Sequence, residues 1–336
     1  MARSPDGRTL KLLIVLHHRF DLWTAPPWFA EKLRADFPEI DVVQLPNYER
    51  LEKEIPGAEI CMAWSLRPQQ FLAARKLRWI HSPAAAVHQL MFPELVNSDV
   101  VLTNASEVHG PVVAEHVIAL IFALAKKIPQ AVRLQQQHVW GQQQLWEKAP
   151  RPRELAEATL GLVGLGSIGR EVAKRASTLG MRVIAVREHA DKAETGVALV
   201  YPPAQLDEML SQSDFVVLAV PVTPRTHGLV SAERFRRMKP GSYLINVGRG
   251  PLVDEAALIA ALRQNKIAGA ALDVFSQEPL SSDSVLWDLE NLLITPHTAG
   301  LTDKLWGRHY MLFSENLRRY LRREPLLGVV DKQRGY

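Results

Sequence analysis

One segment, TLGLVGLGSIGREVAKRASTLGMRVIAV (159–186), restricts the fold of this chain more than any other. It predicts an apolar strand that runs into glycines, a helix that ends at Gly180 and a second strand, which together make a βαβ unit of about 30 residues. Gly164, Gly166 and Gly169 have the spacing G-x-G-x-x-G. Between a strand and a helix, such glycines let backbone N–H groups at the helix N-terminus hold a pyrophosphate. We therefore expect a dinucleotide-binding domain rather than a plain structural turn.

Short apolar runs alternate with helical patterns along the rest of the chain. Strands are expected at 11–16, 41–45, 59–64, 77–82, 99–104, 214–220, 241–247, 268–274 and 291–296. Helices are expected at 28–37, 111–127, 255–265 and 303–323, the second with Pro111 in its first turn. Because strands that alternate with helices form parallel sheets covered on both faces, we expect an α/β fold with two doubly wound domains.

Two segments connect or complete these domains. The Gln-rich stretch 135–153 is the most linker-like part of the chain. The first domain is one helix short, so we expect the C-terminal helix to fold back onto it.

Composition and charge exclude several classes of function. The 40 Lys and Arg residues exceed the 36 Asp and Glu residues by only four, and they are scattered, so we expect no nucleic-acid partner. The single Cys61 allows neither an intrachain disulfide nor a cysteine-ligated metal site, which fits a reducing, cytoplasmic setting. The apolar run 10–16 lacks a cleavage site and is read as a strand, while 117–125 is shorter than the roughly 20 residues of a membrane span. We expect no membrane partner.

Arg249, Glu278 and His297 each follow an apolar strand. Strand carboxyl ends are where open α/β sheets bind ligands, so the three side chains should converge. Hydride transfer from a nicotinamide leaves negative charge on a carbonyl oxygen, which a protonated His297 would quench. Glu278 would hold the other ring nitrogen and favour the protonated form, and Arg249 would grip a substrate carboxylate. Each residue alone also has an ordinary explanation as a surface, capping or turn residue.

The residue after the second strand of the glycine segment bears on the choice of cofactor. Arg187 occupies the position that selects between NAD and NADP, and an arginine there can pair with a 2′-phosphate. This favours NADP(H) over NAD(H). Glu188 opposes that preference if it reaches the ribose or pairs with Arg187, and both residues also fit two exposed loop charges.

Several long motifs in order make the chain resemble the D-isomer-specific 2-hydroxyacid dehydrogenase family over residues 77–330. They are GLVGLGSIGREVAKRASTLGMRVIAV, VPVTPRTHGLV, MKPGSYLINVGRGPLVDEAAL, GAALDVFSQEPL and NLLITPHTAG. The resemblance implies a flavodoxin-like substrate domain (1–105 plus 298–336), a Rossmann nucleotide domain (106–297) and an active site in the cleft between them. It also implies homodimers joined largely through the nucleotide domains, and the roles given above for Arg249, Glu278 and His297.

The resemblance further implies individual contacts. Cofactor contacts would be Gly164, Gly166, Ser167, Ile168 and Gly169 at the pyrophosphate, Val220, Pro221 and Thr226 along the adenosine, Val247 and Gly248 at the nicotinamide ribose, Asp273 at the carboxamide, and Gly300. Asp273 has a structural alternative, the capping of a turn. The segment SPAAAVHQL (82–90) is similar to the family's substrate-carboxylate loop, so Ala85, Ala86 and Val87 would bind substrate with Arg249 and His297. Ala86 replaces the usual Gly and His88 the usual Asp.

The C-terminal segment is similar to the tails of short 2-ketoacid and glyoxylate/hydroxypyruvate reductases. Because the chain ends at Tyr336, we expect these rather than the long phosphoglycerate dehydrogenases. Trp306 either lines the substrate pocket or packs in the core. The main hypothesis is thus an NAD(P)-dependent 2-ketoacid reductase. The alternative is a nucleotide-sensing, corepressor-like binding protein on the same fold.

Overall fold

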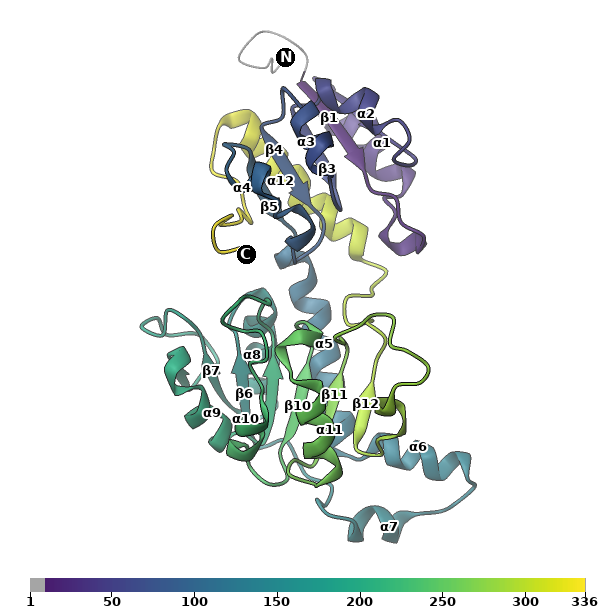
Figure 1. Ribbon diagram of the computed structural model, residues 1–336, viewed down its shortest axis with the longest axis vertical. Coiled ribbons are helices and arrows are strands. Elements are labelled where there is room, and N and C mark those ends of the chain that lie inside the picture. The colour runs from purple at the N-terminus through teal and green to yellow at the C-terminus, as the bar shows by residue number, and fades with distance from the viewer. Residues whose placement is uncertain (1–9, 336) are drawn as a thin grey trace. The chain divides into compact units, whose positions relative to one another are not determined.

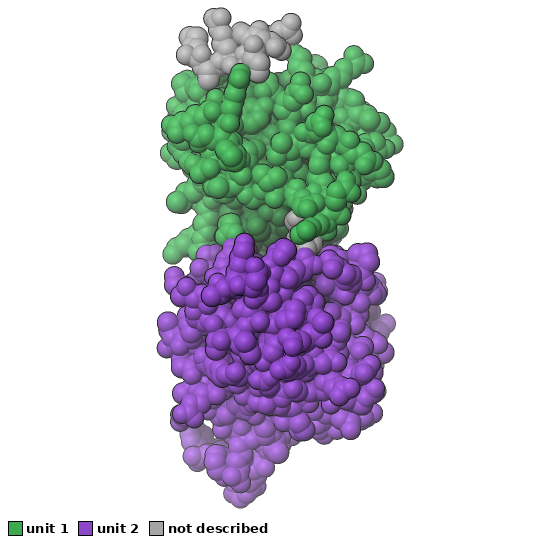
Figure 2. Space-filling model, turned by 90° about the vertical axis from the view of Figure 1, so that its left-hand side faces the viewer, with its two compact units in different colours: residues 1–109, 301–336 green, residues 110–300 purple. Residues whose placement is uncertain are grey.

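The computed structural model describes residues 10–335. The chain divides into two compact units, Met1–His109 with Leu301–Tyr336, and Gly110–Gly300 (Figure 2). Each unit is built on one parallel sheet with helices on both faces, as expected from the alternation of strands and helices (Figure 1). The basic residues that precede the first predicted strand, and Tyr336, lie outside the described residues.

The first unit has the strand order β2-β1-β3-β4-β5, which is that of flavodoxin-like sheets. Its strands are β1 (Leu10–Val15), β2 (Ile40–Gln44), β3 (Ile60–Ala63), β4 (Trp79–Ser82) and β5 (Val101–Asn104). Its helices are α1 (Pro27–Asp36), α2 (Leu51–Glu54), α3 (Pro68–Ala73), α4 (Pro93–Val96) and α12 (Leu305–Arg322). Helices α1 and α12 pack on one face of the sheet, and α2 and α4 pack on the other.

The C-terminal helix α12 folds back onto the first unit, so that prediction is confirmed. Trp79 of β4 stacks on Phe313 and Tyr320 of α12, with ring centroids 5.2 and 5.5 Å apart. Phe29 of α1 and Phe313 are fully buried beside them. Trp306 also belongs to this core and donates from its indole N–H to the Leu22 carbonyl at 2.8 Å, which favours core packing over the pocket alternative.

The second unit has the order β12-β11-β10-β9-β6-β7-β8, which is the Rossmann order with one added strand, β12. Its strands are β6 (Thr159–Val163), β7 (Arg182–Val186), β8 (Leu199–Tyr201), β9 (Phe215–Leu218), β10 (Tyr243–Asn246), β11 (Gly269–Leu272) and β12 (Leu292–Ile294). Its helices are α6 (Ile128–Gln136), α7 (Gln142–Glu147), α8 (Ser167–Thr178), α9 (Leu206–Gln212), α10 (Ala232–Arg237) and α11 (Glu255–Arg263). Helix α5 (Ser106–Ala125) carries the chain from the first unit into the second.

Both faces of the second sheet are buried, which explains its continuous apolar strands. Val216 and Leu218 of β9 point into a core shared with α9, α10 and α11. Phe215 and Val217 point into the opposite core, shared with α5 and α8. This alternation fixes the register of the strand, because a shift of one residue would exchange its two faces.

Some local predictions were wrong. Helix α5 begins at Ser106, so Pro111 lies inside it rather than in its first turn. The Asn104 side chain accepts from the Ser106 N–H at 3.3 Å, and this Asx turn leads the chain into the helix before the proline. The stretch 135–153 is no linker between units; it holds α7 and, with α6, forms an arm of the second unit (Figure 1). The short β8, α9 and α10 went unpredicted because they span at most seven residues each.

Helix α5 (Ser106–Ala125) is longer than the apolar run 117–125, which we had considered too short to span a membrane. Its 20 residues, by length and composition alone, are enough to cross a bilayer. Half of its most apolar window is buried inside the protein, and Val117 and Ile121 are fully buried in the core shared with α8. These contacts are those of a core helix, and a core helix can be as long and as apolar as a membrane-spanning one.

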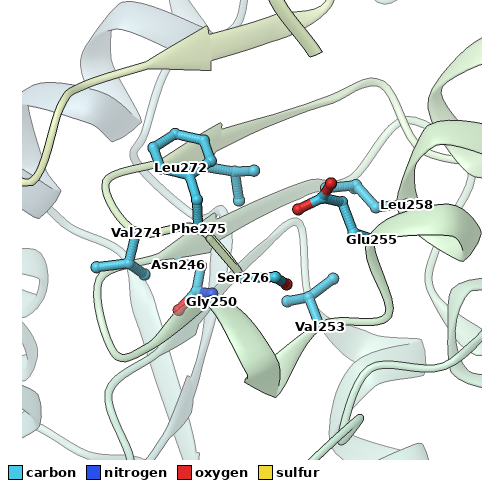
Figure 3. Close-up of a pocket in the computed structure, with 9 residues that line it drawn as sticks. All are labelled: Asn246, Gly250, Val253, Glu255, Leu258, Leu272, Val274, Phe275 and Ser276. Carbon is cyan, nitrogen blue, oxygen red and sulfur yellow. The ribbon is translucent and has the colours of Figure 1, made fainter. Parts of the chain in front are cut away.

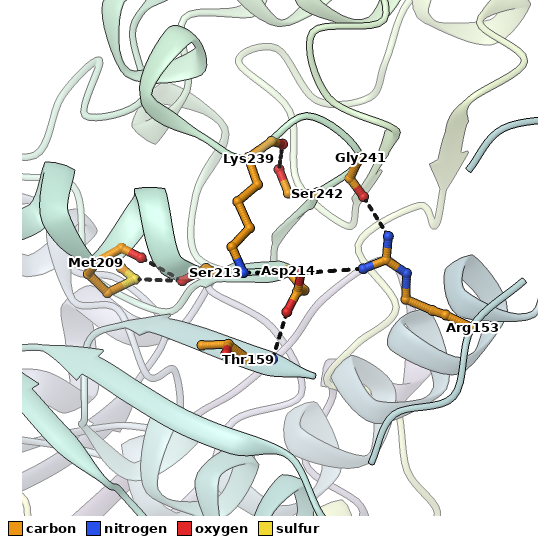
Figure 4. A network of polar contacts seen from close by, with 8 residues as sticks. All are labelled: Arg153, Thr159, Met209, Ser213, Asp214, Lys239, Gly241 and Ser242. Atoms are coloured by element: carbon orange, nitrogen blue, oxygen red, sulfur yellow. Dashed lines mark hydrogen bonds and ion pairs between the residues drawn. The ribbon is translucent and has the colours of Figure 1, made fainter. Parts of the chain in front are cut away.

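A polar network ties together the amino ends of β6, β9 and β10, at the edge opposite the strand carboxyl ends (Figure 4). The Asp214 carboxylate accepts from the Thr159 N–H at 2.9 Å and lies 3.3 Å from Lys239 Nζ and 3.5 Å from Arg153 Nη1. Arg153 also donates to the Gly241 carbonyl and lies over the stacked rings of Phe215 and Tyr243. One carboxylate therefore joins three strands.

We predict that Asp214→Ala lowers the free energy of unfolding of the second unit by about 1–3 kcal/mol, because it leaves a backbone N–H and two cations without their acceptor. Urea denaturation measures the change. Glu233→Ala is the matched control, since Glu233 forms a 4.0 Å pair with Arg237 on the surface and its loss should cost about 0.5 kcal/mol or less. Equal losses in both variants would contradict the role given to Asp214.

Candidate active site

The predicted cofactor and catalytic residues of the second unit follow the carboxyl ends of parallel strands, and these ends lie at one edge of the sheet. The glycine turn follows β6 and Arg187 follows β7. Val220 and Pro221 follow β9, and Val247, Gly248 and Arg249 follow β10. Asp273 and Glu278 follow β11, and His297 and Gly300 follow β12. The topology thus brings together side chains that are more than 100 residues apart in the sequence.

The glycine turn after β6 leaves room for an anionic group. Gly164 has φ +100°, and a Cβ there would lie 2.7 Å from the Ala219 carbonyl oxygen. A Cβ on Gly169 would lie 2.1 Å from the Gly164 oxygen, so both positions require glycine. A Cβ on Gly166, by contrast, would meet nothing within 4 Å, and no side chain caps α8 at that residue. An open helix N-terminus beside bare backbone fits the diphosphate of a dinucleotide.

Arg187 is held in place by its own loop. Its Nε donates to the His189 carbonyl at 2.8 Å, and its Nη1 lies 3.1 Å from Glu194 Oε2. Glu188 pairs with Arg225 rather than with Arg187. Glu188 therefore does not neutralise Arg187. Glu194 does so in part, through its ion pair with Arg187.

His297 and Glu278 are in direct contact. His297 Nδ1 lies 2.6 Å from Glu278 Oε2, while Oε1 of the same carboxylate accepts from the Phe275 N–H at 2.9 Å. With both oxygens engaged, the carboxylate is fixed in orientation. It makes Nδ1 the donor and leaves Nε2 as the atom able to exchange a proton with a ligand.

The backbone of His297 is strained and is held by Asp273. His297 has φ +54°, a region that favours glycine. Its N–H donates to the Asp273 carbonyl at 2.9 Å, and the buried Asp273 carboxylate accepts from the N–H groups of Thr298 and Ala299 at 2.8 and 3.1 Å. These bonds favour the alternative in which Asp273 organises the turn.

Sequence reasoning missed Thr295 of this turn and His116, which contacts it from α5. Thr295 donates from its hydroxyl to Asp273 Oδ1 at 2.6 Å and lies 3.1 Å from His116 Nε2. His116 itself lies 3.6 Å from that carboxylate oxygen. Burial lowers the pKa of His116, against the opposing effect of the Asp273 charge. Thr295 lies within the motif NLLITPHTAG, but no sequence pattern indicates that His116 of α5 contacts this turn.

Arg249 begins a tight loop after β10. The Asn246 amide donates to the Arg249 carbonyl at 2.9 Å and accepts from the Gly248 N–H at 3.1 Å. A Cβ on Gly250 would lie 1.9 Å from the Phe275 carbonyl carbon, so the loop packs directly on the segment that carries Glu278. Burial lowers the pKa of Arg249, while the nearby Glu278 charge raises it. The Arg249 loop thus lies against the segment that carries Glu278, and the Glu278 side chain contacts His297.

A small pocket lies beneath this loop (Figure 3). Its lining residues are Asn246, Gly250, Val253, Glu255, Leu258, Leu272, Val274, Phe275 and Ser276. Neither Glu278 nor His297 lines it, and the amide of Asn246 is already used by the loop. The pocket is therefore a small gap in the packing behind the Arg249 loop and not part of the catalytic residues' surroundings.

The remaining predicted cofactor residues shape the same edge. Thr226 donates from its hydroxyl to the Pro221 carbonyl at 2.7 Å and so closes the turn after β9. A Cβ on Gly248 would lie 2.9 Å from the Val220 carbonyl oxygen, so the loops after β9 and β10 touch.

Among residues 10–335, no group of three or more His, Cys, Asp or Glu side chains could hold a metal ion.

The predicted substrate loop, with Ala85, Ala86 and Val87, lies in the first unit, after β4. Ala86 does not have a positive φ in the described chain. The loop therefore holds its conformation without the glycine that the family commonly has at this position.

Comparisons with known proteins identify the family. The family model described as D-isomer specific 2-hydroxyacid dehydrogenase, NAD binding domain, matches residues 118–299. A glyoxylate reductase of Korarchaeum cryptofilum is 35% identical over 271 residues, which is 78% of this chain and 79% of that protein. A D-3-phosphoglycerate dehydrogenase of Archaeoglobus fulgidus is 33% identical over 305 residues; the match takes in 89% of this chain but only 56% of that longer protein.

A solved structure agrees with this result. The D-isomer specific 2-hydroxyacid dehydrogenase of Xanthobacter autotrophicus Py2, solved with NADPH and MES, has a TM-score of 0.82 and 32% identity, over 98% of this chain and all of that one. The chain is therefore a member of the D-isomer specific 2-hydroxyacid dehydrogenase family, whose members are NAD(P)-dependent oxidoreductases that act on CH–OH groups.

Proposed function

We propose that this protein is a D-2-hydroxyacid dehydrogenase that works as a 2-ketoacid reductase. The observation that carries the proposal is the 2.6 Å contact between His297 Nδ1 and Glu278 Oε2, with the Arg249 loop packed on the segment that carries Glu278. In this proposal, residues 106–297 bind the cofactor, and residues 1–105 with 298–336 bind the substrate.

His297 acts as the proton donor. When bound, the nicotinamide supplies the hydride that reduces the carbonyl carbon. Glu278 accepts a hydrogen bond from Nδ1–H of His297 and keeps the ring oriented, so Nε2 delivers its proton to the carbonyl oxygen as negative charge develops there. The left-handed backbone at His297 and its bonds to Asp273 keep the ring at this position.

Arg249 and the loop of the first unit bind the 2-ketoacid. The guanidinium of Arg249 offers paired donors that suit a carboxylate and polarise the adjacent carbonyl. Ala85, Ala86 and Val87 add backbone N–H groups for the same anion. The substrate is a small molecule; neither a nucleic acid nor a membrane is part of the proposal.

We favour NADP(H) over NAD(H), for an electrostatic reason. Arg187 follows β7, where it can pair with a 2′-phosphate, and the carboxylate of Glu188 is taken up by Arg225 instead of facing that phosphate. The solved relative with bound NADPH supports the same preference.

We propose a homodimer joined through the second unit, in a reducing, cytoplasmic compartment. Helices α6 and α7 and their connection expose apolar side chains, namely Ile128, Val132, Val139, Trp140 and Trp146. Trp140 is 93% exposed, which is unusual for so large an apolar side chain and typical of an interface. Burial raises the pKa of the Cys61 thiol to about 12, so this cysteine is an unreactive core residue.

We predict that His297→Gln lowers kcat by about 100-fold or more, because glutamine cannot deliver the proton, while the KM for NADPH stays unchanged. Initial rates of NADPH oxidation, measured over a panel from glyoxylate to aromatic 2-ketoacids, give both values. His138→Gln, on the α6–α7 arm, serves as the control and should retain full activity. Cofactor binding without turnover by the parent protein would favour the nucleotide-sensing alternative instead.

Arg187→Asp is expected to shift the ratio of kcat/KM for NADPH to that for NADH by at least about tenfold towards NADH, since it replaces a phosphate partner with a ribose partner. Arg182→Asp makes the same charge change at the other end of β7 and should leave the ratio alone. An unchanged ratio in the Arg187 variant would mean that other residues select the cofactor.

Trp140→Ser should weaken self-association by about tenfold or more, as removal of a central interface tryptophan does. Sedimentation velocity over a range of protein concentrations measures this change. Trp28→Ser removes an exposed tryptophan of the first unit and should have no such effect. A parent protein that sediments as a monomer at all concentrations contradicts the dimer.

A further inference from the structure

The core of the first unit contains three histidines that the proposed mechanism does not use. His81 of β4 and His309 of α12 are fully buried, and His109, near the start of α5, is half-buried. The ring centroids of His109 and His309 lie 5.8 Å apart, and the Trp306 ring lies 5.2 Å from His309. The His81 ring lies 5.2 Å from that of Phe313, also on α12. The three histidines, called the histidine cluster below, therefore join the sheet, α12 and the start of α5.

Only one ring nitrogen of His81 has a hydrogen-bond partner. The Trp79 indole N–H donates to Thr103 Oγ1 at 2.8 Å. The Thr103 hydroxyl then donates to His81 Nδ1 at 2.8 Å, since its hydrogen has no other acceptor within residues 10–335. The neutral ring thus carries its hydrogen on Nε2, which is buried without a partner in the same part of the chain. Protonation at Nδ1 would reverse the bond to Thr103 and leave a buried cation.

His309 has no hydrogen-bond partner for either ring nitrogen within the described residues. The titratable groups that act on it are His81 from β4 and His109 from α5, and the positively charged Arg308 precedes it on α12. Burial and the two neighbouring imidazoles lower the pKa of His309, and burial lowers the pKa of His81 to about 3. Over residues 10–335 no carboxylate hydrogen-bonds to either ring or opposes these shifts. A proton on His81 or His309 therefore has no anion to balance it.

The histidine cluster is connected to the loop that follows β4. His109 Nε2 lies 3.3 Å from the carbonyl oxygen of Pro83, the first residue of that loop. His81 lies two residues before Pro83, inside the strand. The packing of α12 on the sheet and the hold on this loop thus depend on the same three rings.

The second unit has no comparable cluster. Among residues 110–300, all of which the structure describes, His116 is half-buried and lies 3.6 Å from the Asp273 carboxylate. The other histidines of this unit are exposed. Acid therefore places no unbalanced proton in the core of the second unit.

We propose that the histidine cluster is an acid-sensitive latch of the first unit. While its imidazoles are neutral, α12 and the loop after β4 stay on the sheet; in mild acid, protonation releases them and leaves the second unit folded. The direction follows from proton linkage. Once released, a histidine binds a proton near its ordinary pKa of 6.5, whereas in the folded core it does so only at lower pH. The first unit is therefore fully stable above this pH and loses stability as the pH falls below it.

Hydrogen exchange followed by mass spectrometry tests the latch on the intact chain, without substrate or turnover. Protection factors, corrected for the intrinsic exchange rate at each pH, are compared between peptides from β4 and α12 and peptides from β9 and β10. From about pH 6.5 to about pH 5, the protection of β4 and α12 should fall by about tenfold or more beyond that of β9 and β10, since each buried histidine contributes up to about tenfold per pH unit. Equal falls in both units would overturn the proposal.

His309→Phe keeps an aromatic ring beside Trp306 but cannot take up a proton. This variant should remove about tenfold of the acid-induced fall in α12 protection. At neutral pH its protection should equal or exceed that of the parent, because the ring nitrogens that it removes had no partners within residues 10–335.

Two further variants complete the test. His309→Leu, with a smaller apolar side chain, gives the same comparison if the phenylalanine ring does not fit. His17→Phe makes the same change at an exposed position of the first unit and should respond to acid as the parent does. A parent-like acid response in both His309 variants would overturn the latch.

Discussion

The candidate site of the second unit depends on one buried carboxylate. Asp273 follows β11 at the bottom of the turn that carries His297, and it collects two backbone N–H groups and the Thr295 hydroxyl. A buried charge is tolerated only when hydrogen bonds satisfy it, so these donors and the carboxylate fix each other. The left-handed conformation of His297, costly on its own, becomes part of a rigid turn and points the imidazole towards Glu278.

The two units place polar groups at strand ends by different means. In the second unit, the glycine turn and the loops after β10 to β12 bring side chains of charged residues together. In the first unit, the loop after β4 is held by its carbonyl groups, which accept from the Asn104 side-chain amide and the Ala105 N–H.

Most of the fold could be predicted from the sequence, because parallel strands buried on both faces give continuous apolar runs. The glycine spacing and the polar residues after the strands indicated the edge at which His297 and Glu278 meet. Short elements such as β8 have too few residues to show a hydrophobic period. The Asx turn at Asn104 leads into α5 before Pro111, so the proline did not mark the start of the helix. The contact of His116 with Thr295 spans 179 residues and arises only from the packing of α5 on the sheet, which no local pattern records.

The return of α12 to the first unit also sets an order of assembly during synthesis. A ribosome releases β1 to β5 first, yet the ring of Phe313 that stacks on Trp79 emerges only after the whole second unit has been made. Domains generally fold as units while the chain grows. The second unit, continuous from Gly110 to Gly300, can therefore close before the first, whose sheet must wait with one apolar face uncovered. The part of the protein that is translated first is the part that is finished last.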